Sequence, residues 1–166
     1  MEIAILNKSE IEFINSSLLK NGGISDSEFK TFSQNHPYVV GKYNDTDIIG
    51  CTKEYYGTQD LEFNNFLISK FGDTDWILDS FYKLTYDVGE CSVPHLDFAN
   101  KQTTIILLSD NFTGGESIID NVDIKMNKTG TFVRFLGSKL KHGVNPIISG
   151  KREVLVVWFN SKKTII

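Results

Sequence analysis

The sequence predicts a mainly β protein with N-terminal helices, an α+β chain whose second half forms a jelly roll. From Lys83 onward, short segments rich in β-branched and aromatic residues alternate with turn residues at intervals of roughly eight to twelve positions. Helix-capping signals are confined to the first half. The 166 residues are 40% hydrophobic and 12% aromatic, which is enough to bury one core. A β-roll with helices packed outside it satisfies all three observations.

We expect residues 1–166 to form a single domain. Residues 1–75 would supply helical and strand support, and residues 76–160 would form the β core.

Helix signals recur through the first 72 residues. Ser9 and Glu12 have the spacing of a capping box and predict a helix over about Glu10–Lys20, which ends at the glycines after Asn21. A second box at Ser25 and Glu28 predicts a short helix that ends before Pro37. Asp60 caps a third helix that Gly72 closes. His36 has no partner spacing around it and is interpreted as a surface histidine.

Strand signals begin before the third helix and dominate after it. Tyr38–Lys42 and Asp47–Tyr56 are predicted strands joined by a turn at Asn44 and Asp45. Trp76–Tyr86 is a predicted strand whose even-numbered apolar residues would share one face. Later strands are predicted at Val93–Phe98, Thr103–Leu108, Glu116–Asp120, around Ile124, Thr131–Leu136, Gly143–Ile147 and Arg152–Phe159.

Composition narrows the possible partners. A net charge of -4 and a pI near 5.4 argue against nucleic acid as a partner, since that needs many basic phosphate contacts. The apolar runs are too short to span a bilayer and the N-terminus has no signal pattern, so we expect a soluble cytoplasmic protein without membrane association. Cys51 and Cys91 are expected to be free thiols. The sequence carries no signal of oligomeric state.

His95-Leu96-Asp97 is the segment with the strongest chemical signal. In an extended chain the two-residue period places the His95 imidazole and the Asp97 carboxylate on one face, where both can bind one metal ion. His142 offers a third ligand. Two histidines and one carboxylate leave coordination positions open, as in non-haem Fe(II) oxygenases, whereas a structural zinc site is closed by a fourth ligand that is usually Cys.

The second half resembles the 2-oxoglutarate and Fe(II)-dependent dioxygenases, in particular the prolyl 4-hydroxylase-like group. The motifs that carry the resemblance run in this order: Tyr86-x-x-Gly89, Pro94-His95-Leu96-Asp97, Thr103 to Ser109, Phe112-x-Gly114-Gly115-Glu116, Gly130-x-Phe132, His142-x-Val144-x-Pro146, and Gly150-x-Arg152 with Trp158. They cover somewhat under half of the chain, and residues 1–75 match no motif of the group.

The resemblance implies a double-stranded β-helix that holds Fe(II) through the catalytic residues His95, Asp97 and His142. It also implies 2-oxoglutarate as cosubstrate, with its 5-carboxylate on Arg152 and further contacts from Tyr86 and Thr103, O2 as the oxidant and ascorbate as a supporting reductant. Tyr86 could equally be an ordinary core residue. Trp158 could line the iron site, or it could equally be a buried core residue.

The charges agree with this assignment. Fe(II) with one aspartate carries one positive charge, 2-oxoglutarate adds two negative charges, and Arg152 balances the last of them, so a dry site would be near neutral. Fifteen of the seventeen basic residues are Lys, and a planar guanidinium at Arg152 suits a carboxylate better than an ammonium does.

The implied function is hydroxylation of an unactivated C–H bond, with release of succinate and CO2. The substrate would be a prolyl or other residue of a peptide or protein, or a small molecule. Two alternatives are a noncatalytic metal-binding jelly roll and a structural jelly roll with a coincidental H-x-D. Nucleic-acid demethylation is a further alternative, but this sequence lacks the paired-arginine pattern of such dioxygenases after His142.

Overall fold

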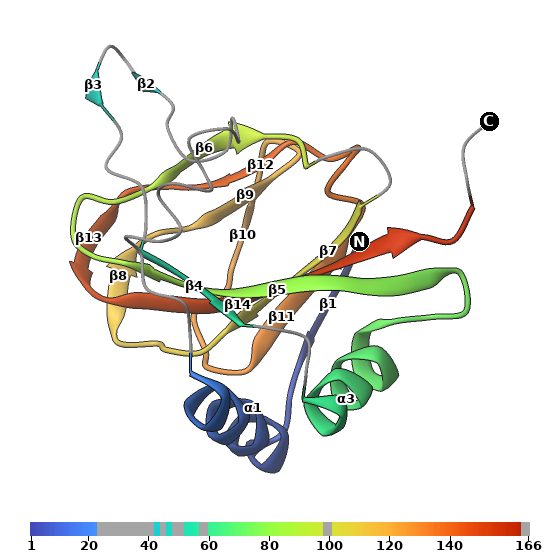
Figure 1. The fold of residues 1–166 in the computed structure, drawn as a ribbon. Helices are drawn as coiled ribbons and strands as arrows, with labels where there is room; N and C mark the ends of the chain where they lie inside the picture. The colour runs from blue at the N-terminus through green and yellow to red at the C-terminus, as the bar shows by residue number, and fades with distance from the viewer. Residues whose placement is uncertain (23–41, 44–45, 48–51, 57–59, 98–100, 164–166) are drawn as a thin grey trace.

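The described residues form antiparallel β-sheets with helices packed on one side (Figure 1). The computed structural model describes residues 1–22, 42–43, 46–47, 52–56, 60–97 and 101–163. The predicted second helix, the turn at Asn44 and Asp45, His36 and Cys51 lie outside these ranges. Cys91 is a free thiol, as expected.

The main sheet has the strand order β1-β11-β7-β14-β5-β4. Its members are β1 (Glu2–Ile5), β11 (Thr131–Phe135), β7 (Lys101–Leu107), β14 (Arg152–Ser161), β5 (Trp76–Tyr86) and β4 (Thr52–Tyr56). Every neighbouring pair is antiparallel. The predicted strands over Thr103–Leu108, Thr131–Leu136 and Arg152–Phe159 are confirmed within two residues at each end.

A smaller antiparallel sheet faces the main sheet (Figure 1). Its order is β10 (Val122–Ile124), β9 (Ser117–Ile119), β12 (His142–Val144) and β6 (Ser92–His95). Two strand pairs complete the described part, β13 (Ile147–Gly150) with β8 (Phe112–Gly114) and β2 (Lys42–Tyr43) with β3 (Thr46–Asp47). The predicted single strand over Gly143–Ile147 is wrong, because β12 ends at Val144 and β13 begins at Ile147. No strand was predicted at β1 or β8.

Helix α1 (Lys8–Asn21) begins at a different cap from the predicted one. The N-cap is Asn7, whose side chain accepts a hydrogen bond from the Glu10 backbone N–H, while the Glu10 carboxylate accepts from the Asn7 N–H. This reciprocal capping box starts two residues before the predicted Ser9 box, because Asn caps a helix as well as Ser does. Helix α3 (Leu61–Phe71) confirms the predicted Asp60 cap.

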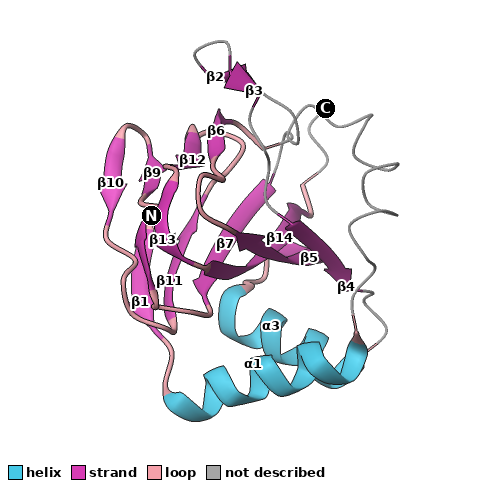
Figure 2. Ribbon diagram, turned by 90° about the vertical axis from the view of Figure 1, so that its left-hand side faces the viewer, coloured by secondary structure: helices cyan, strands magenta, loops and turns pink. Residues whose placement is uncertain are grey.

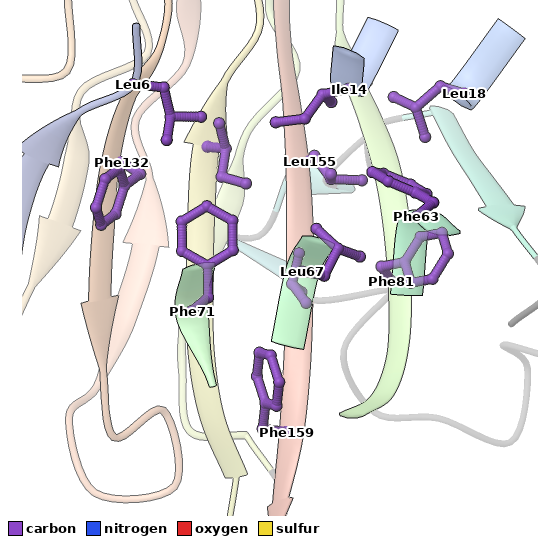
Figure 3. Packing of buried hydrophobic residues seen from close by; sticks show 12 residues of the cluster. Leu6, Ile14, Leu18, Phe63, Leu67, Phe71, Phe81, Phe132, Leu155 and Phe159 are labelled. Atoms are coloured by element: carbon purple, nitrogen blue, oxygen red, sulfur yellow. The ribbon is translucent and has the colours of Figure 1, made fainter. Parts of the chain in front are cut away.

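Both helices pack on one face of the main sheet (Figure 2). Figure 3 shows this layer, in which α1 contributes Ile14 and Leu18 and α3 contributes Phe63, Leu67 and Phe71. The opposite face of the sheet packs against the smaller sheet through a second cluster. Its members include Tyr86, Ile105, Leu107, Ile119, Val133, Phe135, Val144, Val154 and Val156. The central strands β7 and β14 are therefore buried on both faces, and the inner face of the main sheet lines the β-roll. Neither described helix has the length and apolar character needed to cross a membrane.

The prediction that the even-numbered residues of Trp76–Tyr86 share one face is wrong. Opposite β5, Trp158 pairs with Ser80 and Phe159 pairs with Leu78, so Asp79 is an extra residue in a β-bulge. The bulge shifts the alternation by one position. Trp76 and Leu78 accordingly pack toward the helices, whereas Leu84 and Tyr86 pack toward the inner cluster.

Candidate metal centre

Two histidines face each other across adjacent strands of the smaller sheet. His142 on β12 is the antiparallel partner of His95 on β6, and their ring centroids are 4.5 Å apart. Directly opposed residues of an antiparallel pair project from the same face of a sheet. The strand pairing therefore brings together two imidazoles that are 47 positions apart in the sequence.

Backbone carbonyls set the ring orientation of both histidines. His95 Nδ1 lies 2.7 Å from the Val93 carbonyl oxygen, and His142 Nδ1 lies 2.8 Å from that of Leu140. A carbonyl can only accept a hydrogen bond, so each Nδ1 carries a proton. In the neutral ring this leaves the lone pair of each Nε2 for a metal ion. This tautomer is the one that a metal ligand requires.

Asp97 follows β6 and joins the two histidines. Its backbone N–H donates to the Gly137 carbonyl at 2.9 Å, and its carboxylate accepts a hydrogen bond from the Thr103 hydroxyl. Asp97 Oδ1 lies 3.9 Å from His95 Nε2 and Oδ2 lies 3.5 Å from His142 Nε2. Burial raises the pKa of the Asp97 carboxyl, but interactions with His142, the Thr103 hydroxyl and His95 outweigh burial and hold that pKa below its usual value.

The three side chains have the donor set of an open metal site. One ligand atom from each of His95, Asp97 and His142 can be chosen so that all three lie within 4.8 Å of one another. No fourth His, Cys, Asp or Glu among the described residues belongs to the group. Two neutral imidazoles and one carboxylate fit Fe(II), and the absence of a fourth donor in the described ranges does not fit a closed zinc site.

Arg152 is the largest side chain with less than 2% exposure, and it points into the same β-roll. Its Nη2 donates to the Ser117 hydroxyl at 2.8 Å, and its guanidinium carbon lies 5.3 Å from the centre of the Tyr86 ring. Tyr86 is also its antiparallel partner on β5. The structure thus groups Arg152 and Tyr86, while the third predicted cosubstrate contact, Thr103, adjoins Asp97 instead.

A glycine permits the close packing around Arg152. Gly115 has a φ of +64°, and a Cβ at this position would lie 3.1 Å from Arg152 Cδ as well as against Ile147. The Gly114-Gly115 motif therefore lets the chain pass beside the arginine stem.

Three residues of the site did not emerge from the sequence as site residues. Ser117 anchors Arg152, the Gly137 carbonyl holds the Asp97 backbone, and the Phe135 ring packs edge-on against His142 with centroids 4.8 Å apart. Ser117 directly follows the quoted Gly114-Gly115-Glu116 motif, so a signal for it was present. Gly137 stands in none of the quoted motifs, so nothing in the sequence marked it as a site residue.

The structure shows the neighbours of two further side chains, Trp158 and Arg134. The half-buried Trp158 packs edge-on against Tyr82, with ring centroids 5.1 Å apart, and pairs with Thr103 on β7. Arg134 forms an ion pair with Glu2 at 2.9 Å and donates to the Phe71 carbonyl.

Together the fold and the three donors define a double-stranded β-helix protein with a candidate two-histidine, one-carboxylate centre. A search of solved structures finds proteins with this fold. The viral collagen prolyl hydroxylase from Paramecium Bursaria Chlorella virus-1, in its 2OG complex, has a TM-score of 0.61 and 17% identity, with 98% of this chain and 96% of that chain covered. A Pseudomonas putida prolyl-4-hydroxylase has a TM-score of 0.64 and 16% identity, with 98% and 92% covered.

A prolyl hydroxylase from Trichoplax adhaerens, in complex with a hypoxia inducible factor peptide fragment, has a TM-score of 0.55 and 16% identity, with 93% and 92% covered. These similarities confirm the predicted mainly β, double-stranded β-helix fold with N-terminal helices. A scan against protein-family models finds no match, and neither does a search of curated proteins.

Proposed function

We propose that the chain is a 2-oxoglutarate- and Fe(II)-dependent dioxygenase that hydroxylates an unactivated C–H bond and releases succinate and CO2. The observation that carries the proposal is the convergence of His95, Asp97 and His142, with both Nε2 atoms oriented as ligands. These three residues would hold Fe(II), which supplies the oxidation chemistry when it is bound with O2.

Arg152 is the residue proposed to bind the 5-carboxylate of 2-oxoglutarate. Arg152 is almost fully buried, and a guanidinium can bind a carboxylate through two parallel hydrogen bonds. The Ser117 hydroxyl and the Tyr86 ring hold the guanidinium in place, which supports its role as a fixed anchor. Together with Asp97, one arginine balances the charges of Fe(II) and the dianionic cosubstrate.

The proposed substrate is a prolyl or other residue of a peptide or protein, with a small molecule as the further possibility within this function. Support comes from the solved structures of the same fold, among them a collagen prolyl hydroxylase and a prolyl hydroxylase with a bound peptide. His95 is the most exposed of the three ligands, at 24% of its side chain, against 3% for Asp97 and 7% for His142. A substrate would therefore approach from the His95 side.

Anaerobic titration of the Fe(II) protein with 2-oxoglutarate tests the cosubstrate. Chelation by the keto acid should produce a weak visible charge-transfer band. Arg152→Ala should weaken the titration about ten- to a hundredfold, the effect of losing hydrogen bonds of about 1.5–3 kcal/mol to a charged group. Arg134→Ala is the matched control, because Arg134 pairs with Glu2 and should leave the titration unchanged.

Aerobic turnover tests the reaction. The protein with Fe(II), 2-oxoglutarate and ascorbate should release succinate, and His95→Ala should abolish that release. A protein that binds Fe(II) but shows neither the band nor succinate is a noncatalytic metal-binding jelly roll. Failure to bind Fe(II) or a surrogate metal would leave a structural jelly roll.

A further inference from the structure

Thr103 is a buried polar residue whose single hydroxyl hydrogen is already committed. It is 1% exposed, and its Oγ1 donates to Asp97 Oδ2 inside the β-roll. Asp97 itself is 7% exposed, so water does not compete effectively for this hydrogen bond. The contact joins β7 to the segment that follows β6.

We propose that Thr103 is a positioning residue that holds the Asp97 carboxylate so that it offers a metal ion one oxygen, Oδ1. The inference rests on the proposed metal site and deepens it. A carboxylate that binds through both oxygens would occupy two coordination positions. By engaging Oδ2, Thr103 preserves the open positions that a two-point cosubstrate and O2 require.

This role replaces the cosubstrate contact expected for Thr103 from the sequence. The carboxylates of 2-oxoglutarate only accept hydrogen bonds. A hydroxyl whose hydrogen is donated to Asp97 has none left for such a group. Thr103 can therefore serve the carboxylate of the protein or that of the cosubstrate, and its geometry favours the protein.

Gly137 lies beside the hydrogen bond between Thr103 and Asp97. A Cβ at this position would collide with Asp97 Oδ2 and with Thr103 Oγ1. The Gly137 carbonyl meanwhile accepts the Asp97 backbone N–H at 2.9 Å. Asp97 is thus held at its backbone by Gly137 and at its carboxylate by Thr103, and a side chain at position 137 would displace the contact between Thr103 and Asp97.

Cobalt(II) titration of the metal-free protein tests the role without turnover. Co(II) reports both its affinity and, through its visible d–d bands, its coordination. We expect Thr103→Val to bind Co(II) about 10–100-fold more weakly, the usual effect of losing a residue that orients a metal ligand. Its d–d spectrum should also differ from that of the unmodified protein. Thr103→Ala is a second hydroxyl-free variant, in case Val does not fold.

Two further variants separate positioning from packing. Thr103→Ser keeps the hydroxyl and should restore both the affinity and the spectrum. Thr104→Val is the matched control on the same strand, because Thr104 is fully buried and its hydroxyl makes no hydrogen bond within the described ranges. It should bind Co(II) like the unmodified protein.

The outcomes distinguish this inference from the proposed function. If the unmodified protein binds Co(II) and the folded Thr103→Val or Thr103→Ala variant has the same affinity and spectrum, the positioning role is wrong and the metal site stands. If Thr104→Val weakens binding as much as Thr103→Val, the effect is one of packing and the inference also fails. If the unmodified protein binds neither Co(II) nor Fe(II), the metal site itself is wrong.

Discussion

His95 and His142 are direct partners across β6 and β12, with ring centroids 4.5 Å apart and ring planes inclined by 52°. The pairing of two strands therefore determines the distance between the two imidazoles. A slip of one residue would turn one histidine to the opposite face of its sheet. The approach of the two imidazoles depends on this register, whereas Asp97 lies just beyond the end of β6.

Removing one imidazole should abolish metal binding without unfolding the chain. In the unmodified protein, a metal at about 100 times its dissociation constant should raise the free energy of unfolding by about 2.7 kcal/mol. His142→Ala should show no such gain, because two ligands remain of the three. Thermal unfolding with and without Co(II) measures the difference. His36→Ala is the histidine control, and an equal metal response in His142→Ala would contradict the proposed site.

Ser117→Ala should weaken the binding of 2-oxoglutarate and leave metal affinity unchanged. The substitution removes the hydroxyl that accepts from Arg152 Nη2 at 2.8 Å, so the guanidinium loses an anchor. A hydrogen bond to a charged group of about 1.5 kcal/mol corresponds to roughly tenfold weaker binding. The anaerobic keto-acid titration measures it. Ser149→Ala, at an exposed residue of β13, is the control. An unchanged titration in Ser117→Ala would show that Arg152 needs no such anchor.

The packing of α3 against the main sheet should dominate the stability of the helical layer. Leu67 is fully buried in that layer, and Leu67→Ala should lower the free energy of unfolding by about 2–5 kcal/mol. Leu61→Ala, in the same helix at 74% exposure, should change it by less than about 0.5 kcal/mol. Urea unfolding compares the two variants. Equal losses would mean that the helix does not pack as described.

Asp79 should make part of the stability depend on pH. Burial raises its carboxyl pKa, but hydrogen bonds and charge from Lys101, with hydrogen bonds from Ser80 and Asn160, lower that pKa below its ordinary value. An acid whose pKa is lower in the folded state stabilises the fold above its unfolded pKa, and this contribution disappears as the pH falls through the folded pKa.

Asp79→Asn should therefore be less stable than the unmodified protein near neutral pH, by up to about 1 kcal/mol for a partly exposed ion pair. The difference should hold down to about pH 5 and shrink below the ordinary aspartate pKa of about 3.9. Urea unfolding across this range measures it. A difference that persists unchanged into acid would mean that the lost packing or hydrogen bonding of Asp79 matters and its charge does not.

The sequence by itself determined the chemistry of the candidate site and the class of fold. His95, Asp97, His142 and Arg152 stand in motifs whose residue types already specify two imidazoles, a carboxylate and a guanidinium. Turn residues at short intervals indicated a β-roll, and Asp60 with Gly72 marked the ends of α3. These features are readable because they depend on residue identity and on spacing along one segment.

Tertiary structure alone decided how these groups are oriented. The bulge at Asp79 reverses which residues of β5 face the interior, and it arises from pairing with β14. Likewise, Thr103 donates to Asp97, six positions away, and Arg152 donates to Ser117, 35 positions away. The physical reason is that register and close approach are set by pairing and packing between distant segments, which no local pattern of residues encodes.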